Sequence, residues 1–311
     1  MGTNNVQAHH QTDQLEIDYE FLPLLRVYKN GHVQRLMGTD SIPPATDPQT
    51  NVSSKDTFNI VPQTEVYVRI YLPNNIVTNY HNRHRKLPLL FYIHGGAFCI
   101  STPSSLKYHN YLNTLVAEAQ IISVSIHHRR APEYPLPIAY EDSWAALKWV
   151  ASHRNYGPEP WLNSHADFGR VFVAGDSSGA NIAHNVVVAA GVNPELDLGL
   201  DLLGLAVVHQ YFWGSDPIGS ESLDPERKAS VDRLWPMVCP SNPDHDDPRV
   251  NPMVDGGKSL VGLGCRRVLV CVAEKDTLKD RGWLYYQSEK AQVLIKRLAA
   301  FFNRDMPPLV R

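Results

Sequence analysis

No histidine occurs after His245, although the chain continues to Arg311. Long apolar runs are also missing, and no segment approaches the roughly 18 uncharged apolar residues that a membrane-spanning helix requires. The first twenty residues lack the apolar core of a signal peptide. These absences predict a cytoplasmic protein that makes no use of a membrane.

Cysteine and charge are both scarce. The four cysteines are few for 311 residues, so we expect no disulfide framework. The formal net charge is -3 and no long basic run occurs, which gives no electrostatic reason to expect a nucleic acid or a membrane surface as partner. The polar run around His245 lacks a recognised ligand spacing, so we expect no metal and no cofactor. Small molecules are the expected ligands.

The composition is that of one large globular domain. Apolar residues make up 43% of the chain and charged residues 20%. We expect a disordered tail over residues 1–15 and a single domain over 16–311. Within that domain, residues 16–60 have mixed character and a segment rich in proline and aspartate, which favours a cap or lid arm.

From residue 66 onward, β-branched apolar runs alternate with helical patterns. This alternation predicts a doubly wound α/β fold, with a mostly parallel central sheet and helices on both faces. The predicted strands cover residues 66–72, 89–94, 121–126, 170–174, 202–208 and 267–273. The predicted helices cover residues 106–119, 140–153, 180–190 and 226–238.

Ser177 lies at the centre of a G-x-S-x-G motif, Gly175-Asp176-Ser177-Ser178-Gly179, between a predicted strand and a predicted helix. In that context the glycines permit a tight turn that lifts a nucleophilic hydroxyl above the sheet. The free N–H groups at the start of the following helix favour an oxyanion nearby. Ser177 is therefore the expected nucleophile.

A second glycine motif ends the strand predicted over residues 89–94. His94-Gly95-Gly96-Ala97 has the form of an oxyanion loop, in which the N–H groups of Gly95, Gly96 and Ser178 would bind the developing negative charge. We interpret His94 as a structural residue that orients this loop.

The expected acid is Asp276, which follows the strand predicted over residues 267–273 and could reach a histidine ring from its loop. Asp280 is the alternative acid. A helix-capping role for Asp276 is the structural alternative.

The motifs HGGAF at 94–98, RRAPEYPLP at 129–137, GDSSGANIAHN at 175–185 and GLGCRRVLVCVAEKD at 262–276 resemble those of plant carboxylesterases in the hormone-sensitive-lipase-like branch of the α/β-hydrolases. The chain is also similar to the related 2-hydroxyisoflavanone dehydratases. The resemblance runs from Phe21 onward. It implies an α/β-hydrolase fold, a small-molecule ester substrate, Ser177 as nucleophile and Asp276 as acid.

The resemblance also exposes a gap, because the family places a further strand and the catalytic histidine between segments that meet here at Gln287 and Ser288. We therefore expect the last strand and the base to be absent and the enzyme to be impaired or a truncated isoform. His127 and His128 stand where the family usually has Asp and Tyr, and we considered either as a substitute base. We interpret His109, His184 and His209 as packing or pocket residues.

Four residues are expected near the substrate: Ala97, Tyr211, Phe212 and Trp213. Two other functions stay open from the sequence. One is a non-catalytic binding protein similar to the gibberellin receptors, which also lack the triad histidine, although the amino-terminal arm resembles the esterases. The other is a dehydratase similar to the 2-hydroxyisoflavanone enzymes, which Ser177 and the gap make a weaker match.

Overall fold

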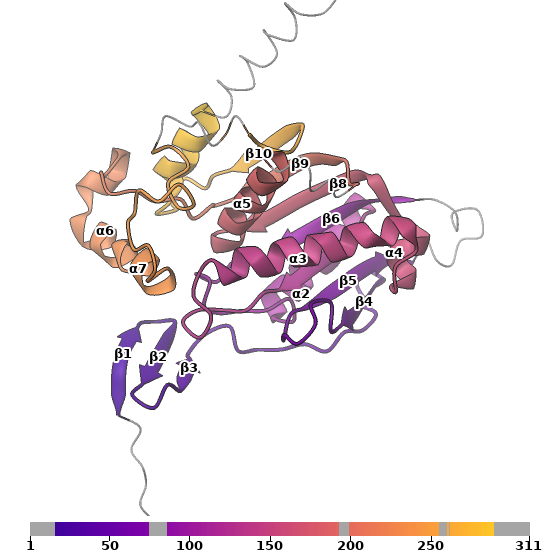
Figure 1. The fold of residues 1–311 in the computed structure, drawn as a ribbon, viewed down its shortest axis with the longest axis horizontal. Coiled ribbons are helices and arrows are strands. Elements are labelled where there is room, and N and C mark those ends of the chain that lie inside the picture. The colour runs from indigo at the N-terminus through magenta and orange to yellow at the C-terminus, as the bar shows by residue number, and fades with distance from the viewer. Residues whose placement is uncertain (1–15, 75–85, 193–198, 255–259, 261, 289–311) are drawn as a thin grey trace, which may run out of the picture.

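The main sheet of the computed structural model has seven strands, in the order β10-β9-β8-β6-β7-β5-β4 (Figure 1). The structure describes residues 16–74, 86–192, 199–254, 260 and 262–288. Strands β7, β6, β8, β9 and β10 run parallel to one another, whereas β5 pairs antiparallel with β7, and β4 with β5. The strands are β4 (Val52–Thr57), β5 (Tyr67–Pro73), β6 (Leu87–Ile93), β7 (Ile122–His127), β8 (Ala166–Asp176), β9 (Leu202–Val208) and β10 (Arg267–Cys271).

Helices cover both faces of this sheet, as predicted. The helices beside the sheet are α2 (Leu106–Ala119), α3 (Ile138–Ser152), α4 (Pro160–His165) and α5 (Ser178–Val192). Strand β6 shows why both faces need cover, because its side chains alternate between two apolar clusters. Leu89 and Phe91 belong to the cluster that includes residues of α3 and α5, whereas Leu90 and Tyr92 pack in the cluster of α2.

The helix predicted over residues 226–238 is two helices, α6 (Pro225–Asp232) and α7 (Leu234–Val238). Pro236 explains the division, because its ring lacks an N–H and would collide with the carbonyl of residue 232 in a continuous helix. A short helix, η3 (Gly219–Leu223), precedes this pair. Together these elements form a layer beyond the carboxyl ends of β8 and β9 (Figure 1).

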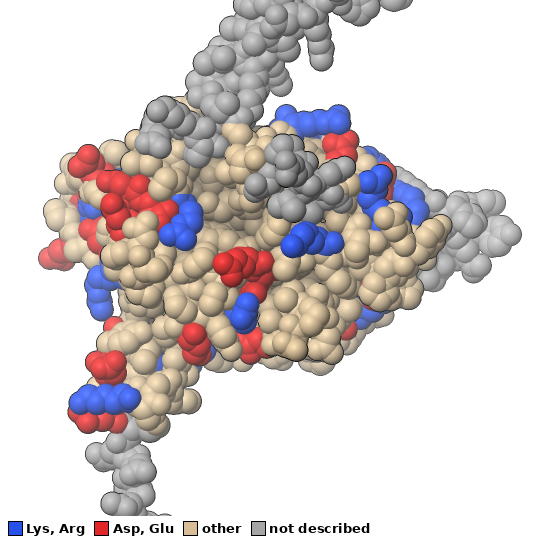
Figure 2. All heavy atoms as spheres, viewed as in Figure 1, with Lys and Arg blue, Asp and Glu red and all other residues tan. Residues whose placement is uncertain are grey.

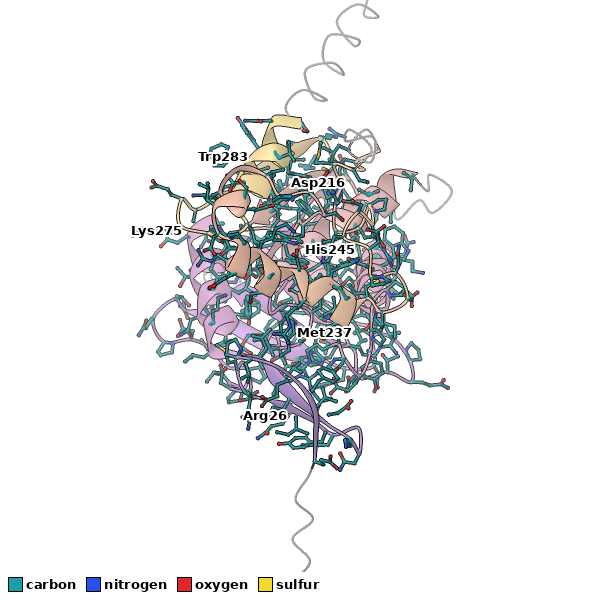
Figure 3. All side chains as sticks on the ribbon, turned by 90° about the vertical axis from the view of Figure 1, so that its left-hand side faces the viewer. Arg26, Asp216, Met237, His245, Lys275 and Trp283 are labelled. Carbon is teal, nitrogen blue, oxygen red and sulfur yellow. The ribbon has the colours of Figure 1, made fainter. Side chains whose placement is uncertain are left out.

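The amino-terminal arm is an antiparallel sheet of its own, made of β1 (Ile17–Phe21), β2 (Leu25–Tyr28) and β3 (Val33–Arg35). Figure 3 shows Arg26 of this sheet at the opposite end of the molecule from Trp283. The structure differs from the expected arm at its end, because β4 is an edge strand of the main sheet. The role of the remaining arm as a cap stays a prediction.

One expectation, the disordered tail over residues 1–15, lies outside the described residues. None of the helices in the described part of the chain is both long and apolar enough to cross a bilayer.

Candidate active site

Ser177 occupies a strained turn between β8 and α5. Its φ of 52° is left-handed, a conformation that costs a non-glycine residue free energy and is typical of functional turns. The flanking glycines are required by space, since a Cβ at Gly179 would lie 2.2 Å from the Ile93 carbonyl oxygen and one at Gly175 would lie 2.4 Å from the Gly179 carbonyl oxygen. The motif therefore folds as a nucleophile elbow, with the start of α5 in close backbone contact with β6 and β8.

The end of β9 holds the elbow from its other side. The Ser177 N–H donates to the Val208 carbonyl oxygen at 2.9 Å, and the Ser177 carbonyl oxygen accepts from the Tyr211 N–H at 2.9 Å. The register pairs Asp176 with Val208, so the next residue on each strand is Ser177 and His209. Ser177 and His209 therefore lie side by side, each one residue past the end of its strand. Neighbouring strands in a sheet are roughly 4.8 Å apart.

Asp176 fixes the oxyanion loop to the elbow. Its Oδ1 accepts from the Gly95 N–H and the Tyr92 hydroxyl, both at 2.9 Å, and its Oδ2 accepts from the Tyr108 hydroxyl at 2.9 Å. Burial, with the Asp176 charge as a further cause, raises the pKa of Tyr92 and of Tyr108 above the ordinary value, so both hydroxyls keep the protons they donate. The loop is thereby held in place before any ligand arrives.

The three expected oxyanion donors differ in availability. The Gly95 N–H already donates a hydrogen bond to Asp176, so Gly95 holds the loop in place and its N–H is not free for an oxyanion. Among the described residues, the N–H groups of Gly96 and Ser178 have no acceptor. Gly96 also needs to be glycine, because its φ is 128° and a Cβ would lie 2.3 Å from the Ile100 carbonyl oxygen.

Asp276 lies in the turn after β10 and faces His209. Its Oδ2 is 3.6 Å from His209 Nδ1, and its Oδ1 accepts from the Leu278 N–H at 2.7 Å. The backbone N–H of His209 donates to the Cys271 carbonyl oxygen at 2.9 Å. The His209 φ of 47° is left-handed, so the backbone leaves the extended conformation of β9 at this residue. Asp280, the alternative acid, instead accepts from the Ser220 N–H at 2.9 Å.

Sequence reasoning missed this partnership, because His209 was interpreted as a packing or pocket residue. The available signal was positional: His209 directly follows a strand that neighbours the one carrying Ser177. The residues considered as substitute bases lie elsewhere. His128 stacks on His94 with ring centroids 4.7 Å apart, and His127 stacks on Tyr67 at 4.8 Å.

A cavity of about 510 Å³ borders Asp276. Trp213 forms one wall and is nearly fully buried, while Lys275 projects from the loop after β10 (Figure 3). The other predicted pocket aromatics are packed in the core: Tyr211 lies edge-on to Phe98, and Phe212 packs against His184 and Tyr285. Ala97 is partly buried in the oxyanion loop and has a left-handed φ of 53°.

Charged side chains of both signs line this cavity. Glu221 pairs with Arg281 inside the protein, where the two side chains are 2% and 5% exposed, and Arg281 also stacks over the Trp213 ring. Figure 2 shows acidic side chains gathered on this side of the visible face, where α6 lies in Figure 1. In the part of the chain that the structure describes, no group of three or more potential ligands is arranged to hold a metal ion.

Comparison with known proteins identifies the family of this chain. The family model described as alpha/beta hydrolase fold matches residues 90–296. Probable carboxylesterase 2 of Arabidopsis thaliana is 46% identical over 277 residues, which cover 89% of this chain and 84% of that protein. The 2-hydroxyisoflavanone dehydratase of Glycine max is 45% identical over 279 residues, which cover 88% and 85%.

The fold has solved counterparts. The thermostable carboxylesterase EstE1, cloned from a metagenomic library, superposes with a TM-score of 0.62 at 26% identity, over 77% of this chain and 75% of that one. A family match over most of the chain, relatives above 40% identity and an esterase fold lead to one assignment. The chain belongs to the α/β-hydrolase fold family and is a carboxylesterase-type hydrolase.

Proposed function

We propose that the chain hydrolyses small acyl esters through Ser177, with His209 as the base. The observation that carries this proposal is that the three residues follow the ends of neighbouring strands, Ser177 after β8, His209 after β9 and Asp276 after β10, and that Asp276 faces His209. Parallel strands bring their carboxyl ends to one edge of the sheet, which is where α/β enzymes assemble their sites.

In the proposed reaction, Ser177 Oγ attacks the ester carbonyl carbon while its proton passes to His209 Nε2. The Gly96 and Ser178 N–H groups stabilise the resulting oxyanion. The alcohol then leaves with the proton from His209, and water hydrolyses the acyl-enzyme by the same route in reverse. Asp276 holds the ring and stabilises the imidazolium that forms.

The His209 geometry supports slow turnover. A base of this kind must carry its ring proton on Nδ1 and donate it to the carboxylate. The 3.6 Å separation from Asp276 is longer than a hydrogen bond, and Nδ1 instead accepts a hydrogen bond from the Ala273 N–H at 3.3 Å, which leaves the ring proton on Nε2. The ring has to turn towards Asp276 before it can act, so productive arrangements are a minority.

The test is the release of p-nitrophenol from p-nitrophenyl acetate in stopped-flow and steady-state assays. We expect a slow, stoichiometric burst that Ser177→Ala abolishes. His209→Ala should slow acylation about a hundred-fold, the usual contribution of a general base. His32→Ala changes an exposed histidine in the amino-terminal arm. It serves as the matched control and should leave the burst intact.

The outcomes separate the two parts of the proposal. Equal rates in wild type and Ser177→Ala would reject ester hydrolysis by this site. A Ser177-dependent burst that His209→Ala leaves unchanged would keep the esterase function and reject His209 as its base. Partial recovery of His209→Ala by added imidazole would support the base assignment further.

The relative from Glycine max gives a dehydratase function as the second candidate, since it is 45% identical. Incubation with 2-hydroxyisoflavanone and product analysis distinguishes the two activities, because dehydration releases an isoflavone and water, whereas the esterase leaves this substrate unchanged. The gibberellin-binding alternative predicts saturable binding in calorimetry.

The lost segment between Gln287 and Ser288 and the cytoplasmic location stay predictions. Sequencing the transcript across this junction tests the first, and fractionation of tagged protein tests the second.

A further inference from the structure

A second cavity of about 360 Å³ lies where the amino-terminal arm meets the main sheet. The arm contributes Arg35 and Thr39, and the sheet side contributes Tyr67, His127 and Arg130. His127 ends β7, which is separated from β8 by β6, so roughly 10 Å of sheet lies between this cavity and the Ser177 strand. The cavity is therefore distinct from the site around Asp276.

Arg130 is the unusual side chain in this cavity. Neighbouring arginines are paired with carboxylates, Arg35 with Glu133 at 2.8 Å and Arg129 with Asp142 at 2.7 Å. Among the described residues, the Arg130 guanidinium instead donates only to the Ser101 carbonyl oxygen, at 3.1 Å, and no carboxylate oxygen lies within 4 Å of it. Burial, with Arg35 nearby, lowers the pKa of Arg130 below its ordinary value.

His127 adds an unsatisfied polar atom. The residue is 6% exposed, and its Nδ1 is buried without a hydrogen-bond partner in the described structure. Burial and the Arg130 charge lower the pKa of His127 to about 3, so the ring is neutral and carries one N–H. The Nδ1 atom is enclosed by protein, so His127 contributes to the cavity as an uncharged ring that lines it.

The remaining polar groups of this cavity are mostly hydrogen-bond donors. The hydroxyls of Thr39 and Thr102 line the cavity and can donate. Asp40 is the one carboxylate in the lining, and it accepts a hydrogen bond from the Leu106 N–H at the start of α2. This bond places its charge against the positive end of a helix and reduces its repulsion of an anion.

We propose that this cavity binds a small oxyanion, a carboxylate or phosphate group, through Arg130, with the His127 ring in the lining beside it. A planar guanidinium can hold two oxygens of such a group at once. Because Arg35 and Thr39 belong to the arm, whereas His127 and Arg130 belong to the sheet side, the bound anion would fasten the arm to the body of the enzyme.

The experiment measures thermal unfolding and ¹⁵N imidazole NMR shifts during titration with sodium phosphate, with sodium chloride added to keep the ionic strength constant. A parallel titration with sodium acetate separates phosphate from carboxylate binding. We expect a saturable shift of the His127 resonance and a rise in melting temperature of about 2–4 °C at phosphate tenfold above its dissociation constant. The same response should persist in Ser177→Ala.

Arg130→Leu should weaken phosphate binding at least tenfold, whereas Arg170→Leu, which removes an exposed arginine, should bind as wild type does. If Arg130→Leu does not fold, Arg130→Lys provides the second variant, because it keeps the charge and loses the two-pronged contact. A wild-type protein without a saturable, phosphate- or acetate-specific response overturns the proposal. Unaltered binding in folded Arg130→Leu or Arg130→Lys overturns it as well.

Discussion

Gln210 buries a whole side-chain amide beside the active site. It is 1% exposed, and neither its Oε1 nor its Nε2 has a partner among the described residues. An unsatisfied buried polar group costs about 1–3 kcal/mol, whereas methionine fills a similar volume without polar hydrogen-bonding demands. We therefore expect Gln210→Met to raise the free energy of unfolding by about 1–2 kcal/mol in urea titrations.

The matched control for this change is Gln34→Met on the exposed face of the arm, which should shift stability by no more than about 0.5 kcal/mol. Destabilisation by Gln210→Met would show that the amide has a partner outside the described residues or in bound water.

Individual site residues differ in how far the sequence could predict them. The placement of Ser177 after β8 and of Asp276 in the turn after β10 could be predicted, because both depend on local motifs, a glycine-flanked turn and a loop carboxylate, whereas their catalytic roles stay predictions. The bond between the Gly95 N–H and Asp176 could not, since it joins residues from two strands. His209 shows the same limit, because its position between Ser177 and Asp276 depends on the pairing of β9 with both β8 and β10.

At the scale of elements, strand β4 depends on one buried ion pair. Arg69 on β5 is 1% exposed in its side chain and donates to both Asp56 oxygens, at 2.6 and 2.7 Å. Removing one partner of a buried pair leaves an uncompensated charge. Asp56→Asn should therefore lower the free energy of unfolding by about 3–5 kcal/mol.

Asp167→Asn provides the control for Asp56→Asn, because it breaks the exposed pair with Arg170, whose side chain is 47% exposed. Such a surface pair contributes about 0–1 kcal/mol. Similar losses in the two variants, measured by denaturant titration, would contradict the assignment of β4 stability to the buried pair.

The elements themselves followed from the sequence where a pattern was long and regular. Helix α2 and strand β9 have the predicted bounds, since apolar periodicity and strand composition agree there. The sequence does not predict the strands of the arm sheet, because β1 to β3 are short and carry few buried apolar residues. Their pairing comes from turns and cross-strand contacts that a periodicity argument does not detect.

At the scale of the whole molecule, buried histidines tie stability to pH. His184 on α5 is fully enclosed, and its Nδ1 lies 3.1 Å from the Tyr285 hydroxyl in the last described helix. Burial lowers the pKa of His184 to about 3, and burial with the Arg130 charge does the same for His127. Each of these rings stays neutral in the folded protein at a pH where it would be protonated in the unfolded chain.

The sign of the effect follows from proton uptake. Below the ordinary histidine pKa of about 6.5, the unfolded state binds a proton that folded His184 refuses, so the free energy of unfolding falls as pH drops towards 3. One such group contributes a slope of up to about 1.4 kcal/mol per pH unit. In urea titrations between pH 7 and pH 4, His184→Leu should therefore lose stability less steeply than wild type, by about that amount per unit.

Tyr285→Phe removes the hydrogen bond but keeps the ring, so it should retain the wild-type slope even if its overall stability is lower. Equal slopes in wild type and His184→Leu would mean that this ring is protonated in the folded protein. The contact between α5 and the last described helix would then not contribute to the pH dependence of stability.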